Sequence, residues 1–237
     1  MIRKAAIFGA SGGIGAALVR HLAGEGWQVR AGSRSGEHPS HDQISGFRFD
    51  LDDEASIAAA AETMRDDPPE LVIAATGVLT LADGTGPERS LKQIDAEAMA
   101  RVLYLNTIGP ALIAKHMLPI MPRDKPSTFA ALSARVGSIG DNRLGGWHSY
   151  RASKAALNML IRNFAIEMGR THKQSVIVGL HPGTVDSELS KPFQSSLPYG
   201  QLTEPEDAAA NLIGVLGGLT PQDSGNVFDW KGERIPD

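Results

Sequence analysis

Tyr150 and Lys154 stand four positions apart and are the side chains in this sequence best suited to acid–base chemistry. The residues after them, Ala155 to Ile161, are mostly good helix formers, and positions i and i+4 of a helix project from one face. A free phenol has a pKa of ~10, and an adjacent ammonium lowers it. Two unit charges ~4 Å apart at an effective dielectric of ~20 interact by about 4 kcal/mol, which moves a pKa by ~3 units. The spacing predicts a tyrosine tuned for proton transfer; the alternative is a chance pair on the surface.

A glycine-rich turn near the start of the chain is the second candidate site. It follows a short apolar strand, Ala5–Phe8, and leads into a helical pattern that begins at Ala16. Glycines at such a turn let the backbone approach a phosphate closely, and the helix N-terminus supplies free N–H groups. This context predicts a dinucleotide-binding loop. The residues assigned to binding here are Gly9, Ser11, Gly12, Gly13, Ile14 and Gly15.

The end of the second predicted strand, Gln28–Gly32, bears on which dinucleotide binds. An acidic residue there would hold the ribose 2′-hydroxyl of NAD, whereas an arginine suits the 2′-phosphate of NADP. The sequence has Ser33 and Arg34 and no acid at this point. An arginine can direct two N–H donors at a phosphate. We therefore expect NADP(H) to be preferred, with NAD(H) possible; the alternative is a solvated surface arginine.

Two further strand ends complete the predicted cofactor site. Asp50 and Leu51 close the third predicted strand, Phe47–Leu51, where they would contact the adenine, although Asp50 could instead cap the next helix. Ala75 and Gly77 lie at the end of the fourth strand, Leu71–Ala75, and their small size would let the cofactor lie close to the backbone. Tight packing alone would also explain them.

Composition narrows the class of protein. The chain has 237 residues, a net charge of −4 and a pI near 6.0, so nothing favours binding to nucleic acid or to an anionic membrane. It has no cysteine, which excludes disulfides and cysteine metal sites and favours a cytoplasmic location. Apolar stretches are too short for a signal peptide or a spanning helix. His38 and His41 lack partners at metal-ligand spacing, so we expect no metal site.

Strand-like and helix-like segments alternate along the whole chain, which predicts a single α/β domain, residues 1–237, with a doubly wound parallel sheet of about seven strands covered by helices on both faces. The other predicted strands are Thr128–Leu132, Ser175–Leu180 and Gly225–Asp229. The predicted helices after the first are 53–65, one running from Asp95 to Met117 across Asn106, 150–169 and 206–216.

With these motifs in place, the chain resembles the short-chain dehydrogenase/reductase family over nearly its whole length. The motifs are the 9–15 turn, Asn106 in Leu105-Asn106-Thr107-Ile108-Gly109, a serine after the fifth strand, Tyr150-x-x-x-Lys154, and 182–185 (Pro-Gly-Thr-Val). The stretch from Val136 to Lys154 is similar to the branch that contains C-factor-type cell–cell signalling proteins and the carbonyl reductase Sniffer.

The resemblance implies a role for each matching residue. Tyr150 would protonate a carbonyl oxygen, Lys154 would lower its pKa and bind the nicotinamide ribose, and Asn106 would hold a water of a proton relay. Ser133 would hydrogen-bond the substrate oxygen, but the matching position can also be Ala134, in which case Ser138 would have to act. The nicotinamide and pyrophosphate would be seated by Pro182, Gly183, Thr184, Val185 and Ser187.

The first functional hypothesis is an NADPH-dependent carbonyl reductase, or the reverse alcohol dehydrogenase, acting on a small molecule. The second is a dinucleotide-binding signalling or regulatory protein of C-factor type with little turnover; a nucleotide-sugar epimerase is a distant third. A lid over 187–203, with Leu189, Phe193, Leu197 and Tyr199, would help select the substrate together with 80–89 and 140–147. Relatives usually pair through the helices bearing Asn106 and Tyr150, so we expect a homodimer or homotetramer.

Overall fold

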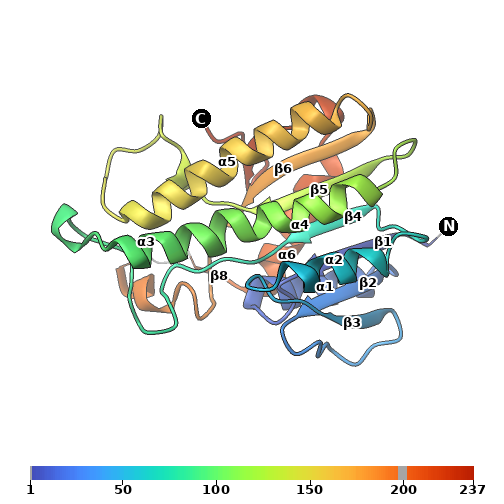
Figure 1. The fold of residues 1–237 in the computed structure, drawn as a ribbon, viewed down its shortest axis with the longest axis horizontal. Helices are drawn as coiled ribbons and strands as arrows, with labels where there is room; N and C mark the ends of the chain where they lie inside the picture. The colour runs from blue at the N-terminus through green and yellow to red at the C-terminus, as the bar shows by residue number, and fades with distance from the viewer. Residues whose placement is uncertain (1, 197–201) are drawn as a thin grey trace.

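The structure, a computed structural model, describes residues 2–196 and 202–237. Its centre is one parallel sheet of seven strands in the order β3-β2-β1-β4-β5-β6-β9 (Figure 1). The strands are β1 (Lys4–Phe8), β2 (Gln28–Ser33), β3 (Ile44–Arg48), β4 (Leu71–Ala74), β5 (Ser127–Leu132), β6 (Ser175–His181) and β9 (Val227–Asp229). The order reverses direction at β1 and β4, which is where doubly wound folds bind their ligands. The predicted fold class is confirmed.

Helices cover both faces of the sheet. One face carries α1 (Gly13–Gly24) and α6 (Pro205–Gly218); the other carries α2 (Glu54–Glu62), α4 (Gly109–Met117) and α5 (His148–Met168) (Figure 1). Successive residues of a strand point to opposite faces, so Ile7 packs with α1 while its neighbour Phe8 packs with the α4 side. Burial on both faces explains why the central strands read as continuous apolar runs.

The long helix predicted across Asn106 is present but interrupted. It consists of α3 (Ala96–Leu103), the π-helical turn η2 (Tyr104–Ile108) and α4. A π turn inserts an extra residue into a helix and often occurs at functional sites. Here it places Asn106 fully inside the protein. In Figure 1 this interrupted helix lies beside α5 on the same face of the sheet.

The third strand was predicted too late in the sequence. The structure has β3 at Ile44–Arg48, paired in register with Val29–Ser33, instead of at Phe47–Leu51. The prediction followed the alternation of Phe47 and Phe49, which both contact the ring of Phe8 at 5.0 Å between centroids. The strand begins with one buried apolar residue, Ile44, followed by Ser45 and Gly46, so its first half carries too little hydrophobic pattern to mark a strand.

The remaining elements are short. The 3₁₀ turns are η1 (Leu91–Gln93), η3 (Leu118–Ile120), η4 (Arg135–Gly137), η5 (Lys191–Ser196) and η6 (Pro221–Asp223). In the predicted lid, β8 (Leu202–Thr203) pairs in parallel with β7 (Thr184–Val185), while Leu197 and Tyr199 lie outside the described residues. Within the part of the chain that the structure describes, no helix is long and apolar enough to cross a bilayer.

Candidate active site

The predicted site residues come together because all seven strands run the same way. Gly9 follows β1, Ser33 ends β2, Gly77 lies just beyond β4, Ser133 follows β5, and Pro182 follows β6. The carboxyl ends of parallel strands meet along one edge of a sheet. Residues separated by more than a hundred positions therefore converge on one edge, and α5 brings Tyr150 and Lys154 to it.

Tyr150 and Lys154 lie on the same side of α5, as their spacing predicts. The ammonium of Lys154 is 5.7 Å from the centre of the Tyr150 ring, and the residues are 3% and 9% exposed, respectively. Burial raises the pKa of Tyr150 to about 12 and lowers that of Lys154 to about 8. The prediction that Lys154 lowers the pKa of Tyr150 is therefore wrong for this structure, because burial raises that pKa and the lysine makes no compensating contribution.

Lys154 is held in place by the backbone around it. Its Nζ donates to the carbonyl oxygen of Leu132, at the end of β5, over 2.8 Å. Two glycines admit it: a Cβ at Gly137 would lie 2.7 Å from the Cβ of Lys154, and a Cβ at Gly77 would lie 3.3 Å from its Nζ. A Cβ at Gly77 would also lie 3.1 Å from Oδ1 of Asn106. The ammonium is therefore fixed between the ends of β4 and β5.

The Tyr150 ring lies in a small apolar cluster with Leu79 and Ala134. Trp147 packs on this cluster with its ring centroid 6.2 Å from that of Tyr150, in an edge-to-face arrangement. Trp147 has a left-handed backbone (φ 49°), which is uncommon for a non-glycine residue and follows two left-handed glycines, Gly145 and Gly146. The segment 140–147 was expected to help select the substrate, but its packing on the Tyr150 ring was not predicted; the Gly145-Gly146 pair was the available signal for the turn.

Asn106 is completely buried, and both polar atoms of its amide group are hydrogen-bonded. Its Nδ2 donates to the carbonyl of Val78 (2.8 Å) and to the hydroxyl of Ser153 (3.1 Å), while its Oδ1 accepts from the N–H of Val78 (2.7 Å). The side chain therefore joins the segment after β4 to α5, one residue before Lys154. Its predicted role in a proton relay stays a prediction.

The two serines proposed for substrate binding point elsewhere. The hydroxyl of Ser133 donates to Oδ1 of Asn158 over 2.5 Å, two turns along α5 from Tyr150. The hydroxyl of Ser138 accepts from the N–H of Asp141 and donates to the carbonyl oxygen of Asp237. Ala134 belongs to the same small apolar cluster as Tyr150 and Leu79. Whether Ser133 or Ser138 fills the serine role stays a prediction.

The glycine-rich turn forms a cradle at the start of α1. Gly9 has a left-handed backbone (φ 98°), and a Cβ on it would lie 2.8 Å from the carbonyl oxygen of Ala75. A Cβ on Gly15 would lie 2.1 Å from the carbonyl oxygen of Gly9, and one on Gly13 would lie 3.2 Å from Cβ of Ser187. The helix begins at Gly12 without a side-chain cap. Its first N–H groups thus remain available to an anion.

Two buried polar atoms without partners lie near the predicted cofactor site. They are the hydroxyl of Thr76, just after β4, and Nδ1 of His181, the residue before Pro182. Burial, helped by the nearby charge of Arg135, lowers the pKa of His181 to about 4, so this ring is neutral. Buried polar groups are normally satisfied, and two such atoms at this edge of the sheet, with Thr76 beside Gly9, fit the presence of a bound polar molecule. These residues are compatible with a nicotinamide dinucleotide.

The residues predicted to contact the adenosine end lie at the ends of β2 and β3. Ser33 is buried, and its hydroxyl donates to the carbonyl of Glu37 and accepts from the N–H of Gly36. Arg34 is exposed, and within residues 2–196 and 202–237 it makes no ion pair. Asp50 accepts from the N–H of Asp52, and Leu51 packs on Gly109. Arg34 is therefore available to a ligand.

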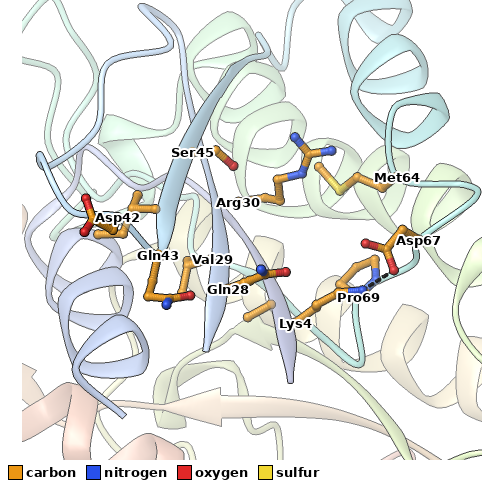
Figure 2. A pocket seen from close by; sticks show the side chains of 12 residues that line it. Lys4, Gln28, Val29, Arg30, Asp42, Gln43, Ser45, Met64, Asp67 and Pro69 are labelled. Atoms are coloured by element: carbon orange, nitrogen blue, oxygen red, sulfur yellow. Dashed lines mark hydrogen bonds and ion pairs between the residues drawn. The ribbon is translucent and has the colours of Figure 1, made fainter. Parts of the chain in front are cut away.

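A further cavity among the described residues lies away from this edge of the sheet. It measures about 290 Å³ and is lined by residues at the amino-terminal ends of the strands, including Lys4, Gln28 and Ile44 (Figure 2). Figure 2 shows Lys4 paired with Asp67 beside it, and Arg30 donates to the backbone of Thr63. This end of the sheet is opposite to the one that carries Tyr150. The cavity is not part of the candidate site.

Comparison with known proteins agrees with this geometry. A family model described as short chain dehydrogenase matches residues 3–197. The C-signal protein of Myxococcus xanthus is 33% identical over 147 residues, which cover 62% of this chain and 83% of that protein. A 1-hydroxy-2-glutathionyl-2-methyl-3-butene dehydrogenase of a Rhodococcus strain is 36% identical over 132 residues, which cover 56% of this chain and 55% of that one.

Solved structures match along the whole chain. A carbonyl reductase from chicken fatty liver, solved with NADPH bound, superposes with a TM-score of 0.83 at 25% identity and covers 100% of this chain and 94% of that one. The carbonyl reductase Sniffer of D. melanogaster superposes with a TM-score of 0.85 at 18% identity over the full length of both chains. At that identity the second match speaks for the fold alone.

Proposed function

Because this chain belongs to the short-chain dehydrogenase family and is therefore an oxidoreductase, we propose that it is an NADPH-dependent carbonyl reductase in which Tyr150 and Lys154 are the acid–base pair. The observation that carries this proposal is their joint burial on one side of α5, at the edge where the glycine cradle lies. The reverse reaction, oxidation of an alcohol, would use the same residues.

The bound dinucleotide would supply the hydride that is added to the carbonyl carbon. Tyr150 would donate its hydroxyl proton to the carbonyl oxygen, so that the C=O bond becomes an alcohol and a phenolate remains. A phenol whose pKa is about 12 is protonated at neutral pH and can fill the donor role. Lys154, with a pKa of about 8, carries its charge at neutral pH and would stabilise the phenolate.

The cofactor would be held by groups along the same edge. The turn Gly9–Gly15 and the N-terminus of α1 would bind the pyrophosphate, with Ser187 close to Gly13. Lys154 would reach the nicotinamide ribose, and the segment 182–185 would seat the nicotinamide. The relative from chicken fatty liver binds NADPH, which supports a preference for the phosphorylated cofactor here, and Arg34 would be its phosphate ligand.

Replacement of Tyr150 by phenylalanine tests the role of the phenol. We expect Tyr150→Phe to lower the rate of NADPH oxidation with aldehydes, ketones or quinones by about 10²- to 10⁴-fold, the usual contribution of a general acid. Binding of NADPH, measured by fluorescence titration, should persist. Tyr104→Phe is the matched control for loss of a tyrosine hydroxyl, because Tyr104 lies outside the cluster around Tyr150 and donates to the carbonyl of Leu51. Its NADPH affinity is measured as well, since Leu51 is a predicted adenine contact. Normal turnover by Tyr150→Phe would refute the proposal.

The same variant also tests a second candidate function, a signalling role. The similarity to the C-signal protein of Myxococcus xanthus favours a signalling role in which the fold binds a dinucleotide but turns over little substrate. In that role, the present chain would bind NADPH and show negligible turnover across the substrate panel. Its cellular phenotype would be insensitive to Tyr150→Phe. The burial of a tyrosine–lysine pair at the cofactor edge favours the enzyme, since a pure binder does not need it.

A further inference from the structure

Glu88 is a buried carboxylate that contacts the first turn of the helix carrying Tyr150. It lies in the loop between β4 and α3 and is 7% exposed. Its two carboxylate oxygens accept the backbone N–H of Ser149 at 3.1 and 3.3 Å, and Oε1 also accepts the hydroxyl of Ser149. Its own backbone carbonyl accepts the N–H of Trp147 over 2.5 Å. Both ends of Glu88 are thus bonded to the residues directly before Tyr150.

The start of α5 needs such a partner. The helix follows the left-handed residue Trp147, whose side chain makes no capping hydrogen bond. The first N–H groups of a helix have no intrahelical acceptor, and a carboxylate at this end also interacts favourably with the helix dipole. Serine, threonine or aspartate directly before a helix usually provides this acceptor. Here Glu88 provides it from a loop that is sixty residues away in the sequence.

Glu88 carries its negative charge inside the protein. Burial acts to raise its pKa, but the hydrogen bonds from Ser149 outweigh this effect, and the net pKa is lowered. In the described residues, no lysine or arginine forms an ion pair with it. The helix N-terminus and the Ser149 hydroxyl therefore compensate the buried charge, which ties the loop firmly to α5.

The same loop borders Tyr150. A small cavity lies between them and is lined by Leu79, Leu81, Glu88, Ser149 and Tyr150, among others. Loop 80–89 was expected from the sequence to help select the substrate. Glu88 thus connects the substrate-facing loop to the turn of α5 that presents the phenol.

We propose that Glu88 is a positioning residue that fixes the first turn of α5, and with it Tyr150, relative to the substrate loop. This inference rests on the proposed function, because it assigns Glu88 a part in the same site. Glu88 acts through the backbone and hydroxyl of Ser149 and does not touch the reacting atoms. Loss of the Glu88 carboxylate increases the mobility of the Tyr150 phenol, which then leaves the position needed for proton transfer. The glycine-rich turn before α1 stays intact.

Three variants test this role in the full-length protein. In Glu88→Ala, kcat for carbonyl reduction should fall by about 10- to 10²-fold, the usual effect of a misplaced catalytic group, while the Kd for NADPH is unchanged. Glu88→Gln keeps one acceptor oxygen and should recover part of the loss. Glu97→Gln is the matched control, because Glu97 is an exposed acid in the first turn of α3. An equal kcat in Glu88→Ala and Glu97→Gln would overturn the proposal.

Hydrogen exchange separates this inference from the proposed function. In Glu88→Ala and Glu88→Gln, the amides of residues 149–151 should exchange faster, whereas those near Ile161 in the same helix should not. If no carbonyl compound is reduced by the wild-type protein, the proposed function fails and the exchange result alone decides the role of Glu88. Unchanged exchange at 149–151, or an equal rise along all of α5, would refute it.

Discussion

Ala134 belongs to the same apolar cluster as Tyr150, at a point where the resemblance to the family leads us to expect a serine hydroxyl. A donor placed where negative charge develops on the substrate oxygen is worth about 10²- to 10³-fold in rate. Without a serine hydroxyl at position 134, Tyr150 would be the donor to the carbonyl oxygen in the proposed mechanism. The side chain at position 134 thus bears directly on the rate of this enzyme.

Ala134→Ser should raise kcat for carbonyl reduction by about tenfold or more, because the new hydroxyl would lie beside the phenol and could donate to the same oxygen. Steady-state kinetics with a single aldehyde would measure the effect.

Ser133→Ala separates the two assignments of the serine role. The Ser133 hydroxyl is bonded to Asn158, so its loss should affect turnover far less than Tyr150→Phe and should lower stability by about 1 kcal/mol. A Ser133→Ala variant as inactive as Tyr150→Phe would restore Ser133 to the catalytic role.

Lys154 gives the cofactor-free protein a pH-dependent stability. Burial lowers its pKa to about 8 from the ordinary 10.5, so the unfolded chain binds more protons than the folded one between these two values. The free energy of unfolding should therefore rise as pH increases from 8 to 10, by at most about 3 kcal/mol, and should be lowest below pH 8. Tyr150 acts in the opposite direction only above its ordinary value of 10.0, because its folded pKa is raised to about 12.

Urea denaturation at several pH values measures this rise. In Lys154→Met the buried ammonium is absent, and the additional stability between pH 8 and 10 should disappear. Lys92→Met is the control, because the side chain of Lys92 is exposed. Identical pH profiles for the wild type and Lys154→Met would show that the lysine is not desolvated in the folded protein.

At the scale of elements, the sequence predicts best where one strong periodic signal is present. The central strands β1, β4, β5 and β6 and the helix α5 were placed to within two residues at each end, since burial on both faces or along one helix face fixes their pattern. The Tyr150–Lys154 pair was found for the same reason: helix geometry alone brings positions i and i+4 together.

The parts that the sequence did not predict depend on contacts made in three dimensions. The π turn at Asn106 reflects the hydrogen bonds between that side chain and Val78, which comes from another segment. The direction of the Ser133 hydroxyl depends on Asn158, and the role of Glu88 depends on a loop that folds back onto α5. No local pattern encodes such pairings, because each partner is ordinary in its own sequence context.

At the scale of the whole molecule, the charge distribution matters for the cofactor. The chain has a net charge of −4, so its overall field does not favour a dinucleotide that carries an additional phosphate. Local groups must supply the attraction: the free N–H groups at the start of α1 and the exposed guanidinium of Arg34 at the end of β2. Asp52, the nearby acid, is bonded bidentately to Arg101 at 2.5 and 2.7 Å and forms no ion pair with Arg34 in the described residues, although the charge of Arg34 helps to lower the pKa of Asp52.

We therefore expect NADPH to stabilise the folded protein more than NADH at equal concentration. A ligand that binds only the folded state stabilises it by about 2.7 kcal/mol at a hundredfold excess over Kd, so Tm reports the affinity. Arg34→Ala removes charged hydrogen bonds worth about 1.5–3 kcal/mol, which would weaken NADPH binding by about 10- to 10²-fold and leave NADH binding nearly unchanged. The difference between the two cofactors should also shrink as salt is added, because the guanidinium is exposed.

Arg170→Ala is the matched control for this experiment, because Arg170 is an exposed arginine just beyond the far end of α5 from Tyr150. It should preserve the preference for NADPH, whereas Arg34→Ala should bring the two Tm shifts close to each other. A wild-type protein stabilised equally by both cofactors, or more by NADH, would contradict the role of Arg34. It would leave the glycine cradle and Tyr150 unaffected, since both cofactors share the pyrophosphate and the nicotinamide.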